Sequence, residues 1–184
     1  MARALAAVVL LLLAAAACGE PHHPDRSADA DPAFRVSEPS RLFFLNVRAA
    51  SYYHSRPRGT DLDLYRSRRF SPTQRRPVLA PTIVHAYQKN EAYVFVEPNG
   101  FPGIADPLTV VWRHADSAGT YRLDVPTRPG QFAFAVDLYE GMLAGHELAV
   151  LLRDSTDVPL YETRTERGHY LGVMRDYFRL TDRM

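Results

Sequence analysis

Apolar and polar side chains alternate with a period of two along much of the chain after Leu42. In the clearest stretch every second side chain is apolar: Phe132, Phe134, Val136 and Leu138. This alternation is typical of strands in antiparallel sheets, which bury one face and expose the other. The sequence therefore predicts a mainly β fold, and its 46% of hydrophobic residues supply enough apolar material for one core.

Nine short segments fit this strand pattern. They are 42–50, 61–67, 79–87, 92–97, 108–114, 120–125, 131–138, 147–153 and 160–163. Pro81 removes a ladder donor, so its segment is expected at a sheet edge or starting after the proline. The segment 92–97 is apolar on both faces and is expected in the middle of a sheet. Nine close strands favour an antiparallel β-sandwich, with a small β-barrel as the alternative.

The segment 138–150 has a turn at 141–145 between two alternating stretches. It resembles the E–F corner of immunoglobulin-like and fibronectin-like sandwiches, and this resemblance implies an immunoglobulin-like sandwich. The segment departs from the family pattern at Leu148, which replaces the expected tyrosine. Trp112 also lacks the cysteine pair against which the tryptophan of such domains packs.

The C-terminal tail has a different period. Its apolar residues recur at helical spacing: Tyr170, Val173, Met174, Tyr177 and Leu180. We expect a short closing helix after Glu166. A final strand through 176–180 is the alternative, because one sequence determines the ends of elements poorly.

The N-terminus begins with Arg3 and a run of apolar residues over 4–17 that contains no polar side chain. This length fits the apolar region of a signal peptide and is shorter than the roughly 20 residues of a spanning helix. The run ends in three alanines directly before Cys18, which is the only cysteine in the chain.

This arrangement resembles the lipobox of bacterial lipoproteins, in which small residues precede a lipidated cysteine. The usual pattern has leucine three residues before the cysteine, where this chain has Ala15. The resemblance implies diacylglyceryl transfer to Cys18, cleavage before it, and acylation of the new amine, with palmitate as the expected acyl group. By analogy with lipoprotein sorting, Gly19 favours the outer membrane where the host has one. An ordinary signal peptide, cleaved after the alanines, is the alternative.

The chain is thus expected to have three parts: a signal peptide at 1–17, a lipidated disordered tether at 18–41, and a single β-sandwich domain at 42–184. The tether assignment depends on four prolines, several acids and few apolar residues, a composition that buries too little surface to order itself. The domain is expected outside the cytoplasm, at the cell envelope.

Seven arginines are concentrated between positions 56 and 76, with Asp61 and Asp63 as the only acids among them. These arginines are Arg56, Arg58, Arg66, Arg68, Arg69, Arg75 and Arg76. They predict binding of anions such as phosphate, acidic glycans or carboxylate-rich partners. A solvated hairpin face is the alternative. The overall charge of +1 argues against a nucleic-acid partner.

No segment carries a nucleophile elbow, a zinc-protease helix or a phosphate-binding loop. Asp61 and Asp63 share a strand face, where they form either an acid/base pair or salt bridges with the arginines. His85 follows two β-branched residues and is expected in the core. The other histidines show no ligand spacing, so no metal or cofactor is expected: His54, His114, His146 and His169.

Aromatic residues are a further candidate surface. Phe43 and Phe44 are adjacent, as are Tyr52 and Tyr53, so one member of each pair is expected to point out of the core. Three more tyrosines are candidates for exposure: Tyr87, Tyr139 and Tyr161. Exposed aromatic groups of this kind bind sugars or peptides in other exported domains.

The sequence therefore predicts a non-catalytic, lipid-anchored domain that binds or assembles with another envelope component. Its expected partners are the membrane, through the lipid, and another envelope protein. One alternative is an envelope hydrolase with a carboxylate-based site, which predicts converging acids with shifted pKa values. The other is an anion or glycan binder, which predicts the seven arginines on one concave face. The leading prediction requires one exposed apolar or aromatic patch.

Overall fold

The computed structural model describes residues 34–70 and 75–183. The predicted signal peptide, Cys18 and most of the predicted tether lie outside these residues. Two four-stranded antiparallel sheets confirm the prediction of a strand-rich antiparallel architecture. Helices are more abundant than predicted, because they take about 34% of the chain against about 36% for strands.

The first sheet has the order β1-β2-β3-β4, in which each strand pairs with its neighbour along the chain. Its strands are β1 (Tyr52–Ser55), β2 (Leu62–Ser67), β3 (Leu79–Ala86) and β4 (Glu91–Pro98). The strands predicted at 61–67, 79–87 and 92–97 are confirmed. β4 lies at the edge, however, and not in the middle of the sheet.

Other segments of the chain cover the exposed edge of β4. The N–H of Ala92 donates to the carbonyl of Phe34, and the N–H of Val36 donates to the carbonyl of Asn90. Farther along, the side chain of Gln131 accepts a hydrogen bond from the N–H of Val96. This cover explains how a strand that is apolar on both faces is stable at an edge.

Pro81 lies within β3, which is an inner strand, so the expectation of an edge strand is wrong. Pairing with β2 ends where Thr82 faces Arg66, one residue after the proline in the chain. Pro81 therefore has only one strand partner, Val96 of β4. Because the pairing with β2 stops before Pro81, no group of β2 needs the N–H that proline lacks.

The second sheet has the order β6-β5-β7-β8 and is also antiparallel throughout. Its strands are β5 (Leu108–His114), β6 (Ser117–Leu123), β7 (Glu147–Leu151) and β8 (Asp157–Leu160). The strands predicted at 108–114, 120–125 and 147–153 are confirmed. The strand predicted at 160–163 lies three residues earlier.

The segment predicted as a strand at 42–50 is helical, and this prediction is wrong. Helix α2 (Glu38–Phe43) continues into a π-helix, η1 (Phe44–Arg48), and a short 3₁₀ helix, η2 (Ala49–Ser51). We call these three elements together the N-terminal helical segment. Ser37 caps it by accepting a hydrogen bond from the N–H of Ser40, and Pro39 occupies the first turn, where no N–H is needed.

The folded part of the chain starts before the boundary expected at residue 42. Val36 is buried in the main core, and residues 38–41 belong to α2. The last part of the predicted tether is therefore part of the fold.

Helix α3 (Arg128–Leu143) replaces the strand predicted at 131–138. Thr127 caps it by accepting a hydrogen bond from the N–H of Gly130, and Pro129 occupies its first turn. The four alternating apolar residues are all buried because the helix is surrounded by other elements. A helix that is apolar on most sides belongs to a core, so alternation here did not indicate a strand.

This correction also removes the resemblance to an E–F corner. The turn at Gly145 follows a helix, whereas the immunoglobulin-like pattern has a strand on both sides. The position of Gly145 in the turn is right, since its φ of 80° is in the left-handed region that favours glycine.

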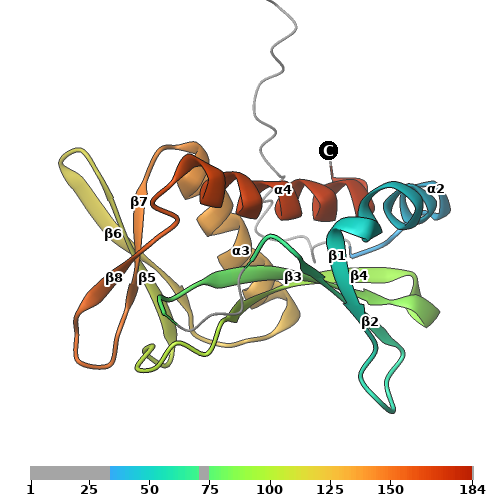
Figure 1. Ribbon diagram of the computed structural model, residues 1–184, viewed down its shortest axis with the longest axis horizontal. Coiled ribbons are helices and arrows are strands. Elements are labelled where there is room, and N and C mark those ends of the chain that lie inside the picture. The colour runs from blue at the N-terminus through green and yellow to red at the C-terminus, as the bar shows by residue number, and fades with distance from the viewer. Residues whose placement is uncertain (1–33, 71–74, 184) are drawn as a thin grey trace, which may run out of the picture.

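Helix α4 (Arg164–Leu180) confirms the predicted closing helix, and the alternative strand at 176–180 is wrong. Thr163 and Glu166 form a capping box at its start. In Figure 1, α4 lies across the sheet of β1–β4, and α2 lies beside its C-terminal end. α3 contacts both β4 and β6 and thereby joins the two sheets.

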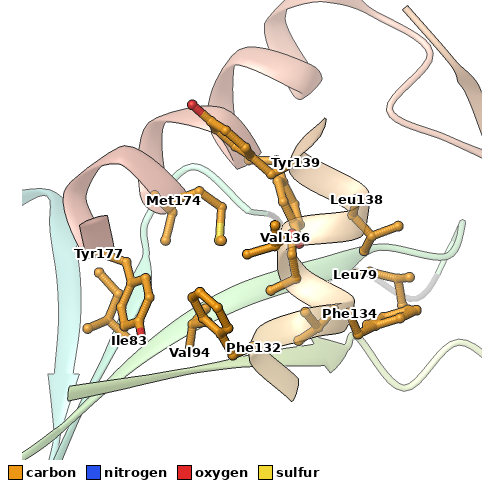
Figure 2. Packing of buried hydrophobic residues seen from close by; sticks show 14 of the residues in the cluster. Leu79, Ile83, Val94, Phe132, Phe134, Val136, Leu138, Tyr139, Met174 and Tyr177 are labelled. Carbon is orange, nitrogen blue, oxygen red and sulfur yellow. Dashed lines mark hydrogen bonds between the residues drawn. The ribbon is translucent and has the colours of Figure 1, made fainter. Parts of the chain in front are cut away.

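Figure 2 shows how α3 fills the space between the first sheet and α4. Phe132 of α3 contacts Tyr177 of α4, with ring centroids 6.0 Å apart. Tyr139, farther along α3, contacts Phe178 at 5.2 Å. These side chains belong to one cluster of buried residues that extends from the first sheet to the second.

A buried carboxylate ties α4 to the N-terminal helical segment. Asp176 accepts two hydrogen bonds from Arg48, from Nε at 2.8 Å and from Nη2 at 3.0 Å. The hydroxyl of Tyr52 donates a third at 2.6 Å. Burial and the neighbouring carboxylate raise the pKa of Tyr52, which keeps this proton in place. With three donors, the buried charge of Asp176 is compensated.

We predict that Asp176→Ala lowers the free energy of unfolding by about 2–4 kcal/mol, because Arg48 and Tyr52 then lose their common partner. Urea denaturation of the purified chain carrying Cys18→Ser measures this loss. Asp124→Ala is the control, since its ion pair with Arg122 is exposed on both sides and contributes little. Equal stability of the two variants would contradict the prediction.

Candidate functional site

The outward face of the N-terminal helical segment is mostly apolar, with Asn46 as an exposed polar residue among its apolar side chains. Four large side chains on it are exposed: Leu42 at 46%, Phe43 at 42%, Leu45 at 37% and Val47 at 54%. We call them the apolar row. Surface helices normally present polar residues to water. An exposed group of this size therefore marks a candidate interaction surface.

Two inward side chains fix which face points outward. Phe44 is buried against Tyr52 and Tyr65, with ring centroids 5.6 and 5.0 Å away. Arg48, four residues later, points inward to Asp176. These two anchors are the first and last residues of the π-helix, which turns more slowly than an α-helix. The four side chains of the apolar row are the large apolar groups of this segment that stay exposed.

Adjacent aromatic pairs behave as the sequence predicted. Phe43 and Tyr53 are exposed, whereas their neighbours Phe44 and Tyr52 are 3% exposed. For Phe43 and Phe44 the prediction assumed a strand, but one member of the pair also points outward in the helical segment that these residues form. Of the three other tyrosines, Tyr87 is exposed as predicted. The prediction that Tyr139 and Tyr161 are exposed is wrong, because both are buried in the core.

One edge of the apolar row carries an arginine and a tyrosine. The guanidinium of Arg41 lies 5.9 Å from the ring centroid of Tyr87, which is 54% exposed. Arg41 also donates two hydrogen bonds to Glu38, and chiefly through these bonds it lowers the pKa of that carboxyl. Glu38 is thus ionised and neutralised, and no further acid follows in the sequence before Asp61.

A cluster of polar side chains lies at β1 and β2 of the first sheet, around Asp63. Asp63 is buried and accepts hydrogen bonds from His54 Nε2 at 2.8 Å and from Arg56 at 2.8 and 2.7 Å. Burial raises the pKa of Asp63, but the hydrogen bonds from Arg56 and His54 outweigh it and hold the pKa below its ordinary value. Both oxygens of this carboxylate are occupied, which makes it a structural anion.

His85 lies next to Asp63 across the β2–β3 ladder. It is 4% exposed, which confirms the prediction of a core histidine. Within the described residues its Nε2 has no hydrogen-bond partner. Burial lowers the pKa of His85, Asp63 opposes this effect, and Arg41 adds to it. His85 is therefore neutral near pH 7.

The two predicted carboxylates do not converge. Asp61 lines an open cavity of about 640 Å³ together with Arg56, Tyr87 and three others, whereas Asp63 does not reach that cavity. Asp63 instead forms the salt bridge that the sequence allowed as the alternative to an acid/base pair. Among residues 34–70 and 75–183, no three His, Cys, Asp or Glu side chains are placed to hold a metal ion.

The arginines predicted to bind anions are divided between several surroundings. Arg56, Arg66 and Arg76 form salt bridges, with Asp63, Glu97 and the pair Glu162 and Glu166, respectively. Arg68 donates to the carbonyl of Tyr52 and lies over the ring of Tyr53.

The remaining three arginines, Arg58, Arg69 and Arg75, form no salt bridge with any described residue, and all are exposed. Arg69, Arg75 and Arg76 line one cavity of about 360 Å³, which His169 also borders. The structure thus brings three of the seven arginines together.

The single tryptophan belongs to a stacked group on the second sheet. Trp112 stacks on His146 with ring centroids 4.5 Å apart, and Tyr121 hydrogen-bonds to Nδ1 of that histidine at 2.9 Å. A Cβ on Gly119 would lie 2.8 Å from the indole, so the ring lies against the glycine backbone. With one face on Gly119 and His146 stacked on it, Trp112 offers no open face for a sugar.

No protein-family model, no curated protein and no solved structure matches this chain. In the described part of the chain, no helix is long and apolar enough to cross a membrane.

The neutral, buried state of His85 predicts a pH-dependent stability. Its folded pKa lies below the ordinary value of 6.5, so below that pH the unfolded chain takes up a proton that the folded chain does not. The free energy of unfolding then falls as the pH is lowered, by at most about 1.4 kcal/mol per pH unit for this residue. The glutamine in the variant His85→Gln is uncharged at every pH, so this variant lacks the contribution of His85 to the pH dependence of the free energy of unfolding.

Urea unfolding at pH 7.5 and 5.5 compares the two proteins. We expect a smaller loss of stability in H85Q, with a residual loss from His146, whose pKa is lowered by burial and by His114. An identical loss in both proteins would show that His85 is not the buried titrating group.

Proposed function

We propose that this protein is a lipid-anchored, non-catalytic module of the cell envelope, which works by docking on another envelope component through the apolar row. The observation that carries this proposal is the outward position of Leu42, Phe43, Leu45 and Val47 on a helix that two inward anchors hold in place. Covering such a surface removes apolar area from water, which favours association with a partner.

The predicted anchor agrees with this role. Cys18 is the only cysteine and stands where the lipobox pattern places the lipidated residue. Attached acyl chains hold a protein at a bilayer, and two or more hold it stably. We keep the outer membrane as the proposed location because of Gly19. We also propose a sandwich-like arrangement of the two sheets, which their antiparallel pairing and the one buried cluster shared by both sheets support.

An anion or glycan binder is the second candidate. It is favoured by the cavity that Arg69, Arg75, Arg76 and His169 border, because guanidinium groups bind phosphate and carboxylate bidentately. It is weakened by the salt bridge between Arg76 and Glu166, which already satisfies one of the three cations.

The anchor is tested with Cys18→Ser. We expect this variant to lack the lipid and to leave the membrane fraction, with at least a tenfold drop in the membrane-bound share, because several acyl chains provide the attachment. Mass spectrometry of the mature N-terminus and fractionation of cells measure both effects. A C18S protein that is processed normally and stays in the membrane fraction overturns the lipid anchor.

Docking is tested by thiol accessibility. Lipidation consumes Cys18 in the proposal, so Val47→Cys introduces a single reactive thiol within the apolar row. Val125→Cys is the matched control, since Val125 is 61% exposed and lies in the loop between β6 and α3. In envelopes, we expect maleimide to modify V47C at least tenfold more slowly than V125C. In the soluble C18S background without detergent, the two positions should react alike. Equal rates in envelopes would refute docking through this face.

A further inference from the structure

We propose that the component covering the apolar row is the lipid surface of the membrane that holds the anchor, so that the N-terminal helical segment lies in the bilayer interface. This inference depends on the proposed function and names the partner of its docking face. Three observations support it: the place where the chain enters the fold, the charge of the segment, and the size of the row.

The apolar row lies where the predicted anchor joins the fold. Cys18 precedes Glu38, the first residue of α2, by twenty positions in the sequence. A chain of this length spans at most about 70 Å when fully extended. The row is therefore confined near the membrane by the anchor, and confinement raises its effective concentration at the lipid surface. Under this condition, a weak apolar contact is enough to keep the row on the lipid surface.

The charge of the segment is compatible with anionic headgroups. After Glu38, no acidic residue occurs until Asp61, whereas Arg41, Arg48, Arg56 and Arg58 fall within this stretch. Glu38 itself is neutralised by Arg41. Arg48 and Arg56 are already paired with Asp176 and Asp63, so Arg58 is the arginine of this stretch without a salt bridge to any described residue. Asp182, which accepts a hydrogen bond from Ser40, is the acid that a lipid surface meets beside α2, and no unpaired acid belongs to the stretch itself.

The edge of the row has the composition of a membrane interface. Tyrosine is enriched at the level of the headgroups, because its ring is apolar and its hydroxyl is polar. Arginine extends its charged end toward the headgroups while its stem contacts apolar material. Arg41 precedes Leu42 in the sequence and lies over the ring of the exposed Tyr87, so it brings both kinds of group to the start of the row. Interfacial helices bury their apolar face to a depth of about 5–10 Å.

The size of the row argues against a protein as its main partner. Stable protein interfaces bury about 1,200–2,000 Å² and combine an apolar centre with a polar rim from several elements. Four half-exposed side chains on one helical segment provide much less. A lipid surface has no such minimum area, because the acyl chains supply most of the attachment and the row adds orientation.

Photocrosslinking in cells tests this inference with the full chain. A leucine analogue bearing a diazirine is incorporated at position 47, and at position 125 as the control. Both native side chains are exposed, so neither change disturbs the core. Thermal unfolding followed by circular dichroism verifies that each variant folds. After irradiation, adducts are separated and identified by mass.

We expect phospholipid adducts at position 47, with a yield at least tenfold above that at position 125. Adducts at position 47 with a protein in place of lipid would overturn the lipid surface and leave docking through the row intact. Equal lipid yields at the two positions would also overturn it. If position 47 gives no adduct and V47C reacts as fast as V125C, both the inference and the docking proposal fail.

Discussion

The buried carboxylate of Asp176 determines how the two ends of the described chain meet. Its charge is stable inside the protein only while Arg48 and Tyr52 donate to it, and these donors come from a segment 128 and 124 positions away in the chain. Arg48 therefore has to point inward, four residues after Phe44. This requirement fixes the rotation of the N-terminal helical segment about its axis, and the outward position of the apolar row is its consequence.

The elements that the sequence predicted correctly are those in which one face is buried and the other is wet. β2 is the clearest example, because Asp63, Tyr65 and Ser67 are buried while the residues between them are half-exposed. The sequence predicts a strand where α3 lies because this helix is buried on nearly all sides, and an apolar residue at every second position then fits a helix equally well. The signals that distinguish the two lie outside the alternating stretch, in the cap residue Thr127 and in Pro129.

The candidate site was only partly predictable for a similar reason. For the adjacent pairs Phe43-Phe44 and Tyr52-Tyr53, the sequence predicts that one member points outward, but not which one. The rule does not hold for every pair, because the adjacent Tyr177 and Phe178 of α4 are both buried. The apolar row does not follow from the sequence, because it depends on the helix start at Ser37 and on long-range partners of Phe44 and Arg48. The arginines illustrate the same limit. Arg66 pairs with Glu97, which lies 31 positions away in the sequence, and Arg76 pairs with Glu166, which lies 90 positions away.

Arg41 connects the apolar row to the polar cluster behind it. Its side chain lies over Tyr87, and its charge adds to the effect of burial in lowering the pKa of His85. His85 in turn contacts Tyr87, with ring centroids 6.3 Å apart. A surface that covers Arg41 and Tyr87 removes water from the approach to His85, and loss of water penalises the charged form of histidine. If the proposed docking covers Arg41 and Tyr87, reciprocity requires that protonation of His85 weakens docking to the same extent that docking lowers the pKa of His85. Arg41 contacts Tyr87 and Tyr87 contacts His85, so these two contacts are the route by which the proposed docking would affect the buried histidine.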